Sequence, residues 1–279
     1  MSEVGTVRKN ESRKAYAAEH GSVVWQKKGE YAVESEKITV FRKLLEESER
    51  IVFFGGAGVS TESGIPDFRS ATGLYSKKLA QHVSPEQLVS HTFFERCPEE
   101  FFDFYRKRLV YMEAAPNDCH KALAALERMG KLRAVITQNI DGLHQLAGSS
   151  RVLELHGSIR RSYCMDCHAL YDENFLMASE GVPHCTRCGG TVKPDVVLYE
   201  ESLDEAVLDA AVREIAAADM LIVGGTSLVV YPAAGLLRYF GGRHLVLINK
   251  TATQADAEAE LVIHDSLGEV MREAVAALG

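Results

Sequence analysis

Residues 51–70, IVFFGGAGVSTESGIPDFRS, constrain the fold most, because a short apolar run there breaks abruptly into glycines. The apolar run Ile51–Phe54 predicts a strand that is buried on both faces, as in a parallel sheet. The glycines of Gly55–Gly58 allow the tight turn and close backbone approach that a bound phosphate requires. A helix that began near Val59 would direct free amides and its positive dipole end towards that phosphate.

This glycine turn differs from the fingerprint of hydride-transferring dehydrogenases. Thr61 stands where the pattern G-x-G-x-x-G has its last glycine. About 20 residues beyond the turn, where the fingerprint has an acidic residue for the ribose, residues 73–77 read GLYSK. The turn alone is equally typical of an ordinary strand-to-helix connection, and a standard dehydrogenase unit is disfavoured.

Composition and charge exclude several classes of protein. With 279 residues and 46% hydrophobic content, the chain can bury a sizeable core in one large domain, with or without a smaller insert. The formal net charge of −8 disfavours bulk attraction to nucleic acid or an anionic membrane, so we expect neither as a direct partner. No run approaches the roughly 18 apolar residues of a membrane span, and the first residues lack the apolar core of a signal peptide. We therefore expect a cytoplasmic protein, and a monomer.

Strands alternate with helices along most of the chain. The charged residues 1–36 are either a frayed arm or a docked helix, and apolar spacing predicts an amphipathic helix over Ile38–Arg50. Later segments read as strands over Lys131–Thr137, Arg151–Leu155, Pro194–Tyr199, Met220–Val223, His244–Ile248 and Ala259–Ile263, and as helices over Asp118–Met129, Asp204–Ala218 and Leu267–Leu278. This alternation predicts an α/β fold with a Rossmann-like, doubly wound parallel sheet.

Polar or glycine-rich residues follow several of these strands directly. Residues 138–144 read QNIDGLH, His156 precedes a glycine, residues 224–227 read GGTS, and Asn249 ends another strand. Open α/β sheets bind ligands at the carboxyl ends of their strands, so these residues are expected at one site. His156 is the candidate catalytic residue of the set.

A second local signal lies between residues 164 and 188. Two C-x-x-C pairs separated by seventeen residues have the spacing of a zinc ribbon: Cys164, Cys167, Cys185 and Cys188. Four thiolates leave no open coordination position, so the zinc should be structural and should hold a small inserted lobe. His168 and His184 are alternative ligands, and Cys97 and Cys119 have no assigned role.

Seven motifs in order, GAGVSTESGIPDFRS, TQNIDGLH, LELHG, the paired C-x-x-C, KPDVV, GGTSLVVYPAA and LIN, make residues 38–279 resemble the sirtuins. Sirtuins, of the silent information regulator type, are NAD-dependent protein lysine deacylases, and the resemblance is to bacterial-like members. It implies a Rossmann-like NAD-binding domain made of residues 37–74, 116–157 and 194–279. The small domain would combine a helical module, residues 75–115, with a zinc-binding module, residues 158–193, while residues 1–36 form an N-terminal extension.

The resemblance also implies which residues bind NAD between the two domains. The expected contacts are Ala57, Gly58, Thr61, Phe68, Arg69, Gln138, Ile140, Asp141, Thr226, Ser227 and Asn249. Phe68 and Arg69 would lie in a loop that closes over the cofactor. Ile140 and Asp141 would hold the carboxamide of the nicotinamide, while Asn249 would contact the adenosine ribose.

NAD would be consumed in this reaction, and an acetyl-lysine protein or peptide would be the second substrate. His156 would act as general base on the ribose hydroxyls, with Asn139 and Asp141 as further catalytic residues. The peptide would lie extended against Val196, Val197, Gly225 and Leu228. The expected products are free lysine, nicotinamide and 2′-O-acetyl-ADP-ribose.

Three alternatives remain open at the level of sequence. Sirtuins that prefer succinyl groups carry a Tyr-x-x-Arg pair, whose places Phe102 and Tyr105 occupy if Pro116–Asn117 sets the register. Tyr105–Arg108 does spell that pair about one helical turn later, so a deacetylase is expected and another acyl preference is the alternative. The other two are a protein mono-ADP-ribosyltransferase and a non-catalytic zinc-ribbon binding module.

Overall fold

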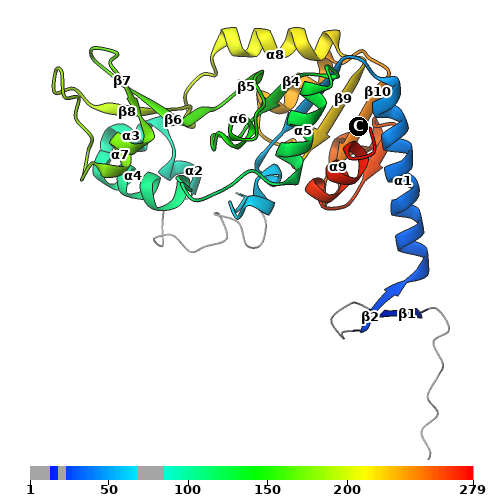
Figure 1. Cartoon of the computed structure of the whole chain (residues 1–279). Coiled ribbons are helices and arrows are strands. Elements are labelled where there is room, and N and C mark those ends of the chain that lie inside the picture. Colours follow the sequence, from blue (N-terminus) through cyan, green and yellow to red (C-terminus); the bar gives the residue numbers. More distant parts are fainter. Residues whose placement is uncertain (1–12, 18–22, 68–84, 279) are drawn as a thin grey trace, which may run out of the picture.

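A six-stranded parallel sheet forms the centre of the computed structural model, which describes residues 13–17, 23–67 and 85–278 (Figure 1). The strands are β3 (Ile51–Gly55), β4 (Leu132–Thr137), β5 (Val152–Glu154), β9 (Met220–Gly224), β10 (His244–Ile248) and β11 (Leu261–Ile263). Their order across the sheet is β11-β10-β9-β3-β4-β5, and every neighbouring pair is parallel. Successive strands are added on one side of β3 (β4, β5) and then on the other (β9, β10, β11), and doubly wound sheets open a crevice for a ligand at this switch between β3 and β9.

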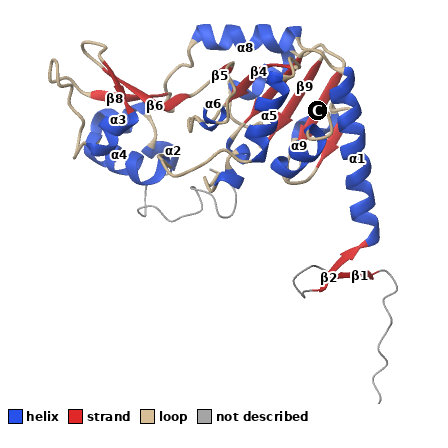
Figure 2. Ribbon diagram, viewed as in Figure 1, coloured by secondary structure: helices blue, strands red, loops and turns tan. Residues whose placement is uncertain are grey.

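Helices cover both faces of this sheet (Figure 2). One face packs against α1 (Lys28–Glu47), α5 (Asp118–Arg128) and α9 (Leu267–Val275), and the other against α8 (Glu205–Ala217) and the 3-10 helix η5 (Ala233–Tyr239). Within β3, Ile51 and Phe53 enter the first cluster while Val52 and Phe54 enter the second. The alternation of side chains along a strand explains why the whole apolar run is buried, as the sequence predicts.

The small domain is built from a three-stranded antiparallel sheet and short helices. The sheet has the order β7 (Leu170–Asp172), β6 (Gly157–Cys164), β8 (Val192–Val196), and α7 (Glu173–Ala178) follows β7. The helices α2 (Pro85–Leu88), α3 (His91–Arg96), α4 (Pro98–Phe104) and the π-helical turn η4 (Tyr105–Leu109) pack against it. Phe101, Phe102 and Tyr105 form the buried centre of this second core.

The beginning of the chain differs from the sequence prediction. Helix α1 begins at Lys28, well before Ile38, and an antiparallel hairpin of β1 (Arg13–Ala17) and β2 (Val23–Lys27) precedes it. The hairpin was missed because strand pairing depends on partners and leaves little signal in a charged segment without alternation. None of the described helices is long and apolar enough to cross a membrane.

The segment after the glycine turn also differs, because no α-helix begins at Val59. Two 3-10 turns, η1 (Ala57–Val59) and η2 (Thr61–Ser63), stand there instead. The side-chain amide of Asn117 donates to the Val59 carbonyl at 2.7 Å, so that carbonyl already has a partner outside the local backbone. The strand predicted over Pro194–Tyr199 does not join the parallel sheet: it is β8, begins at Val192 and pairs antiparallel with β6. Smaller differences are the short elements α6 (Leu143–Leu146) and η6 (Gln254–Ala257), which interrupt connections.

Candidate active site

Two glycine turns pack directly against each other at the crevice between β3 and β9. The Gly58 N–H donates to the Gly225 carbonyl oxygen at 2.8 Å, and Gly225 has a positive φ of 59°. A Cβ atom at Gly58 would lie only 2.7 Å from the Gly225 Cα atom, so a larger residue would separate the turns. Ala57, Gly58 and Gly225, all predicted site residues, are therefore brought together at the switch point of the sheet.

Polar side chains from β4, β9 and β10 surround these turns. The side-chain amide of Gln138 donates to the Thr226 hydroxyl at 3.0 Å, and the Thr226 N–H donates to Asn249 Oδ1 at 3.0 Å. The Nδ2 group of buried Asn249 has no hydrogen-bond partner. A buried amide donor is rarely left unpaired, so this group fits an acceptor oxygen of a bound nucleotide such as NAD.

A hydroxyl that sequence reasoning missed joins two of the predicted catalytic residues. Ser60 Oγ donates to Asp141 Oδ2 at 2.7 Å and accepts from the Asn139 side-chain amide at 3.0 Å. The Leu143 N–H donates to the other Asp141 oxygen at 2.9 Å. Burial raises the pKa of Asp141, and the hydrogen bond from Ser60 opposes that shift. Ser60 follows the glycine turn directly, but its partners lie about eighty residues away and give no local pattern.

His156 follows β5 and turns one ring nitrogen towards the neighbouring loop. Its Nδ1 atom lies 2.8 Å from the main-chain oxygen of Gln138, which only accepts, so Nδ1 carries the proton. The other ring nitrogen is then the basic one. Burial lowers the pKa of His156, with the Gln138 carbonyl opposing the shift, and the imidazole is neutral at pH 7.

The remaining predicted site residues lie around the glycine turns and His156, except for two that are not described. The Thr61 hydroxyl donates to the Gly58 carbonyl at 2.9 Å and closes the first turn. Ile140 packs against the core of the small domain, Ser227 is exposed, and Leu228 has a positive φ of 55°. Val196 lies on β8, an edge strand, and the Val197 N–H donates to the His156 carbonyl at 3.0 Å. Phe68 and Arg69 lie outside the described residues.

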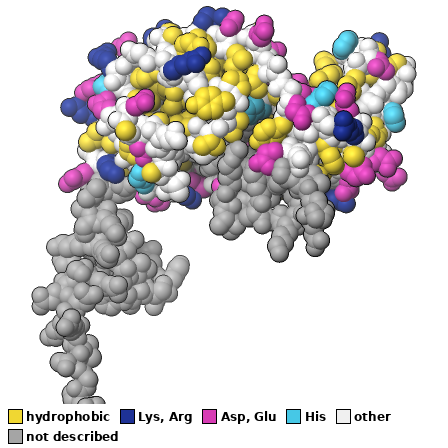
Figure 3. All heavy atoms as spheres, turned by 180° about the vertical axis from the view of Figure 1, so that it is seen from behind, with side chains coloured by type: hydrophobic (Ala, Val, Ile, Leu, Met, Phe, Trp, Pro, Cys, Tyr) yellow, Lys and Arg dark blue, Asp and Glu magenta, His cyan; other side chains and the backbone are white. Residues whose placement is uncertain are grey.

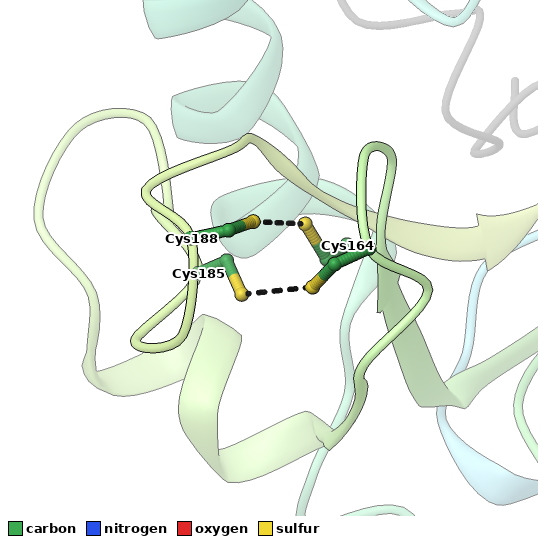
Figure 4. A group of neighbouring side chains, drawn as sticks. Cys164, Cys185 and Cys188 are labelled. Carbon is green, nitrogen blue, oxygen red and sulfur yellow. Dashed lines mark hydrogen bonds between the residues drawn. The ribbon is translucent and has the colours of Figure 1, made fainter.

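The four predicted cysteine ligands form one cluster in the small domain. All four sulfur atoms lie within 4.8 Å of one another, with Cys164–Cys188 at 3.4 Å and Cys167–Cys185 at 3.6 Å. Figure 4 shows the sulfur atoms of the labelled cysteines turned towards a common centre. Tetrahedral zinc with bonds of about 2.3 Å requires sulfurs about 3.8 Å apart, so the cluster fits a structural zinc ion. The histidines His168 and His184 are not in the cluster.

The crevice, the unpaired Asn249 amide and the cysteine cluster define a Rossmann-like nucleotide-binding protein with a structural zinc module. The model of the Sir2 family matches residues 56–232. A protein named NAD-dependent protein deacetylase from Clostridium perfringens (strain 13 / Type A) is 63% identical over 86% of this chain and 99% of its own length. Its namesake from Staphylococcus aureus (strain N315) is 46% identical over 84% of this chain and 96% of its own length. The chain belongs to the Sir2 family.

Solved structures agree with this assignment. A structure described as the structural basis for the mechanism and regulation of Sir2 enzymes has a TM-score of 0.78 and 42% identity, covering 87% of this chain and 97% of its own. A Sir2 structure with a deacetylated p53 peptide and 3′-O-acetyl ADP ribose also has a TM-score of 0.78, at 38% identity, covering 86% of this chain and 98% of its own.

Proposed function

We propose that the chain is an NAD-dependent protein lysine deacetylase in which His156 is the general base. The observation that carries this assignment is the contact of 2.8 Å between His156 Nδ1 and the Gln138 carbonyl. It fixes the tautomer and leaves Nε2 with a lone pair to accept a proton from a ribose hydroxyl. The lowered pKa keeps the ring in its basic form at neutral pH.

NAD supplies an electrophilic ribose carbon, which the acetyl oxygen of the substrate attacks as nicotinamide leaves. The two glycine turns carry no side chains that would keep the pyrophosphate from approaching the backbone, and Thr226 and Asn249 are proposed to line its adenosine side. The Ser60–Asn139–Asp141 network orients the amide and carboxyl groups proposed to hold the nicotinamide end. His156 then accepts the proton of a ribose hydroxyl so that this oxygen can attack the acetyl carbon. Water adds to that carbon and the lysine amine leaves, which gives free lysine and the acetyl ester of ADP-ribose.

The acetyl-lysine peptide is proposed to add a strand along the free edge of β8. That strand ends at Val196, and its next residue, Val197, hydrogen-bonds to the His156 carbonyl at 3.0 Å. An added strand gains affinity mainly from its main chain, so many target sequences would be accepted. Gly225 and Leu228 would form the opposite wall of the peptide groove.

We also propose that the chain is a cytoplasmic monomer that acts on proteins and has no nucleic acid or membrane partner, and the charge of the molecule supports the last point. The net charge is −8, and on the face in Figure 3 Lys and Arg side chains are scattered among acidic ones instead of forming one basic patch. The proposed division assigns residues 37–74, 116–157 and 194–279 to NAD binding, 75–115 and 158–193 to the small domain, and 1–36 to an extension.

Mass spectrometry of an acetyl-lysine peptide incubated with and without NAD tests the function. The expected products, formed only with NAD, are the unmodified peptide, nicotinamide and acetyl-ADP-ribose. His156→Tyr should abolish them, while His244→Gln should not, because His244 begins β10 and contacts Glu260 at 2.7 Å. Nicotinamide release without an acetylated peptide, with label transferred to protein, would instead indicate an ADP-ribosyltransferase.

A further inference from the structure

Two consecutive arginines lie on β6, the strand that leads from His156 into the zinc-binding module. Arg160 and Arg161 lie at an irregularity in the pairing of β6 with β8, between Ser158 and Ser162, and their side chains contact different parts of the molecule. Arg161 joins β5 of the central sheet to β8 of the small sheet, and Arg160 joins the loop after β4 to α7. These side-chain contacts add to main-chain bonds between the same parts of the molecule, such as the bond from the Ile159 N–H to the Ile140 carbonyl at 2.9 Å.

Arg161 connects the strand before His156 with the strand proposed to bind the peptide. Its Nη1 atom lies 2.6 Å from Glu154 Oε2 on β5, and its Nε atom lies 2.5 Å from Asp195 Oδ2 on β8. Glu154 is largely buried and also accepts from the Gln145 side-chain amide of α6 at 2.8 Å. A guanidinium group can hold two carboxylates in fixed directions, so β5 and β8 are clamped at this point.

Arg160 makes a corresponding connection between the loop after β4 and α7. Its Nε atom donates to the main-chain oxygen of Asp141 at 3.3 Å, and its Nη1 atom lies 3.1 Å from Glu173 Oε1, at the start of α7. Gly142 lies directly beneath it, because a Cβ atom there would be 2.9 Å from Arg160 Cγ. The loop that carries Asn139 and Asp141 is thereby tied to the zinc-binding module.

We propose that Arg160 and Arg161 are positioning residues that align the peptide strand and the nicotinamide loop with His156. This role rests on the proposed deacetylase function. In this proposal the large domain holds most of NAD and β8 holds most of the peptide. Each substrate can therefore bind without the contacts of Arg160 and Arg161. Only the reaction between NAD and the peptide requires both sides to be aligned, because small displacements of reacting groups are costly.

The positioning role therefore predicts that loss of either arginine lowers kcat and leaves KM nearly unchanged. Arg161→Gln should lower kcat about tenfold, because a small misplacement of reacting groups is costly. The KM for NAD and the KM for the acetyl-lysine peptide should both stay within about twofold of the wild-type values. Arg160→Gln should act in the same direction. Arg161→Lys keeps the charge but not the forked geometry, so it should recover only part of the lost kcat.

The matched control is Arg151→Gln, which removes an arginine–glutamate contact on the large domain. Arg151 Nη2 lies 2.5 Å from Glu214 Oε1, and neither residue is in the proposed site. The control should keep the wild-type kcat. Steady-state rates and bound zinc are measured for the full chain and all four variants, and zinc content should stay at the wild-type value.

Three outcomes separate the two proposals. An inactive wild-type protein would refute the deacetylase function. An active wild type with unchanged kcat in Arg161→Gln and Arg160→Gln would overturn the positioning role alone. Loss of zinc, or an equal rise of both KM values at constant kcat, would also overturn it, because the arginines would then serve folding or binding.

Discussion

The carboxylate of Glu62 accepts a hydrogen bond from the Gly268 N–H at 3.1 Å, at the start of α9. The Ser266 hydroxyl donates to the same oxygen at 2.8 Å. Glu62 lies in η2, which leads from the glycine turn into the loop proposed to close over NAD. A negative charge at a helix N-terminus is favourable, so α9 and the NAD turn stabilise each other.

Loss of this contact should affect both stability and NAD binding. Glu62→Ala leaves the first amides of α9 without a cap and is expected to cost about 1 kcal/mol of unfolding free energy. It should also raise KM for NAD severalfold, because η2 loses its attachment. Glu62→Gln keeps an acceptor oxygen, so its unfolding free energy and its KM for NAD should lie between those of the wild type and of Glu62→Ala. Urea unfolding and steady-state kinetics test this, and a variant identical to wild type in both would contradict it.

Local patterns in the sequence predicted the strands of the central sheet and the zinc site, whereas the strands β1, β2, β6 and β7 and the contacts between distant segments were not predicted. The apolar run of β3 and each C-x-x-C pair are complete within a few residues, and one short interval in the chain separates the two pairs, so both signals can be read along the sequence. The Glu62–Gly268 contact joins residues 206 positions apart, and the Ser60–Asp141 contact joins residues 81 apart. Such pairs form only when the sheet brings loop ends together, and no periodicity in one chain reveals them.

The pH dependence of the reaction should report the environment of His156. Burial lowers its pKa below the ordinary 6.5, so the basic form persists into mildly acidic solution. The acid limb of kcat/KM for the acetyl-lysine peptide is therefore expected to have its midpoint below pH 6.5. A pH–rate profile at fixed ionic strength measures it, and a midpoint above that value would exclude His156 in this environment as the titrating base.

Two other histidines, His120 and His144, should make the protein sensitive to acid. Their rings lie 4.7 Å apart in the core, and burial lowers the pKa of His120 to about 4 and that of His144 to about 3. Between pH 6.5 and about 4 the unfolded chain binds protons that the folded protein does not, so stability is present above that window and falls as pH falls. The loss at about pH 5 should be roughly 2 kcal/mol for each histidine.

Unfolding in urea at neutral pH and at about pH 5 measures this loss. His144→Gln should unfold more easily at neutral pH but show a shallower dependence on pH, because one titrating group has been removed. An unchanged pH dependence in that variant would mean that His144 takes up its proton as readily in the folded protein as in the unfolded chain.

Removal of zinc should unfold the small domain before the large one. The cysteine cluster joins β6 to the segment before β8, and Cys164 and Cys185 are buried in the same core. Cys185→Ser is expected to lose the metal, lower Tm and abolish deacetylation, because β8 carries the proposed peptide edge. Cys97→Ser is the matched control, since Cys97 lies outside the cluster, and it should retain about one zinc per chain. Full activity of metal-free Cys185→Ser would contradict a structural role for zinc.

The acyl preference follows from the buried aromatic cluster of the helical module. Phe102 and Tyr105 are fully buried, and Ile140 packs against the same cluster. Burial raises the pKa of Tyr105, which keeps its hydroxyl neutral, and Arg108 is exposed on η4. Arg106 lies over the Phe102 ring, 5.6 Å from its centroid, and its Nε group donates to the Leu176 carbonyl at 3.0 Å, so this cation already has a partner. We therefore expect a succinyl carboxylate to enter a largely apolar site at a cost of several kcal/mol. We expect kcat/KM for acetyl-lysine to exceed that for succinyl-lysine by about 100-fold or more.

Arg108→Ala separates this explanation from the alternative suggested by the Tyr105–Arg108 spacing. If Arg108 does not reach the acyl group, the variant should leave the rates on acetyl- and succinyl-lysine peptides unchanged. Parallel assays of wild type and variant on the same peptide sequence measure both rates. Faster turnover of the succinyl peptide by wild type, lost in Arg108→Ala, would show that the arginine turns into the acyl site and that the chain is a desuccinylase.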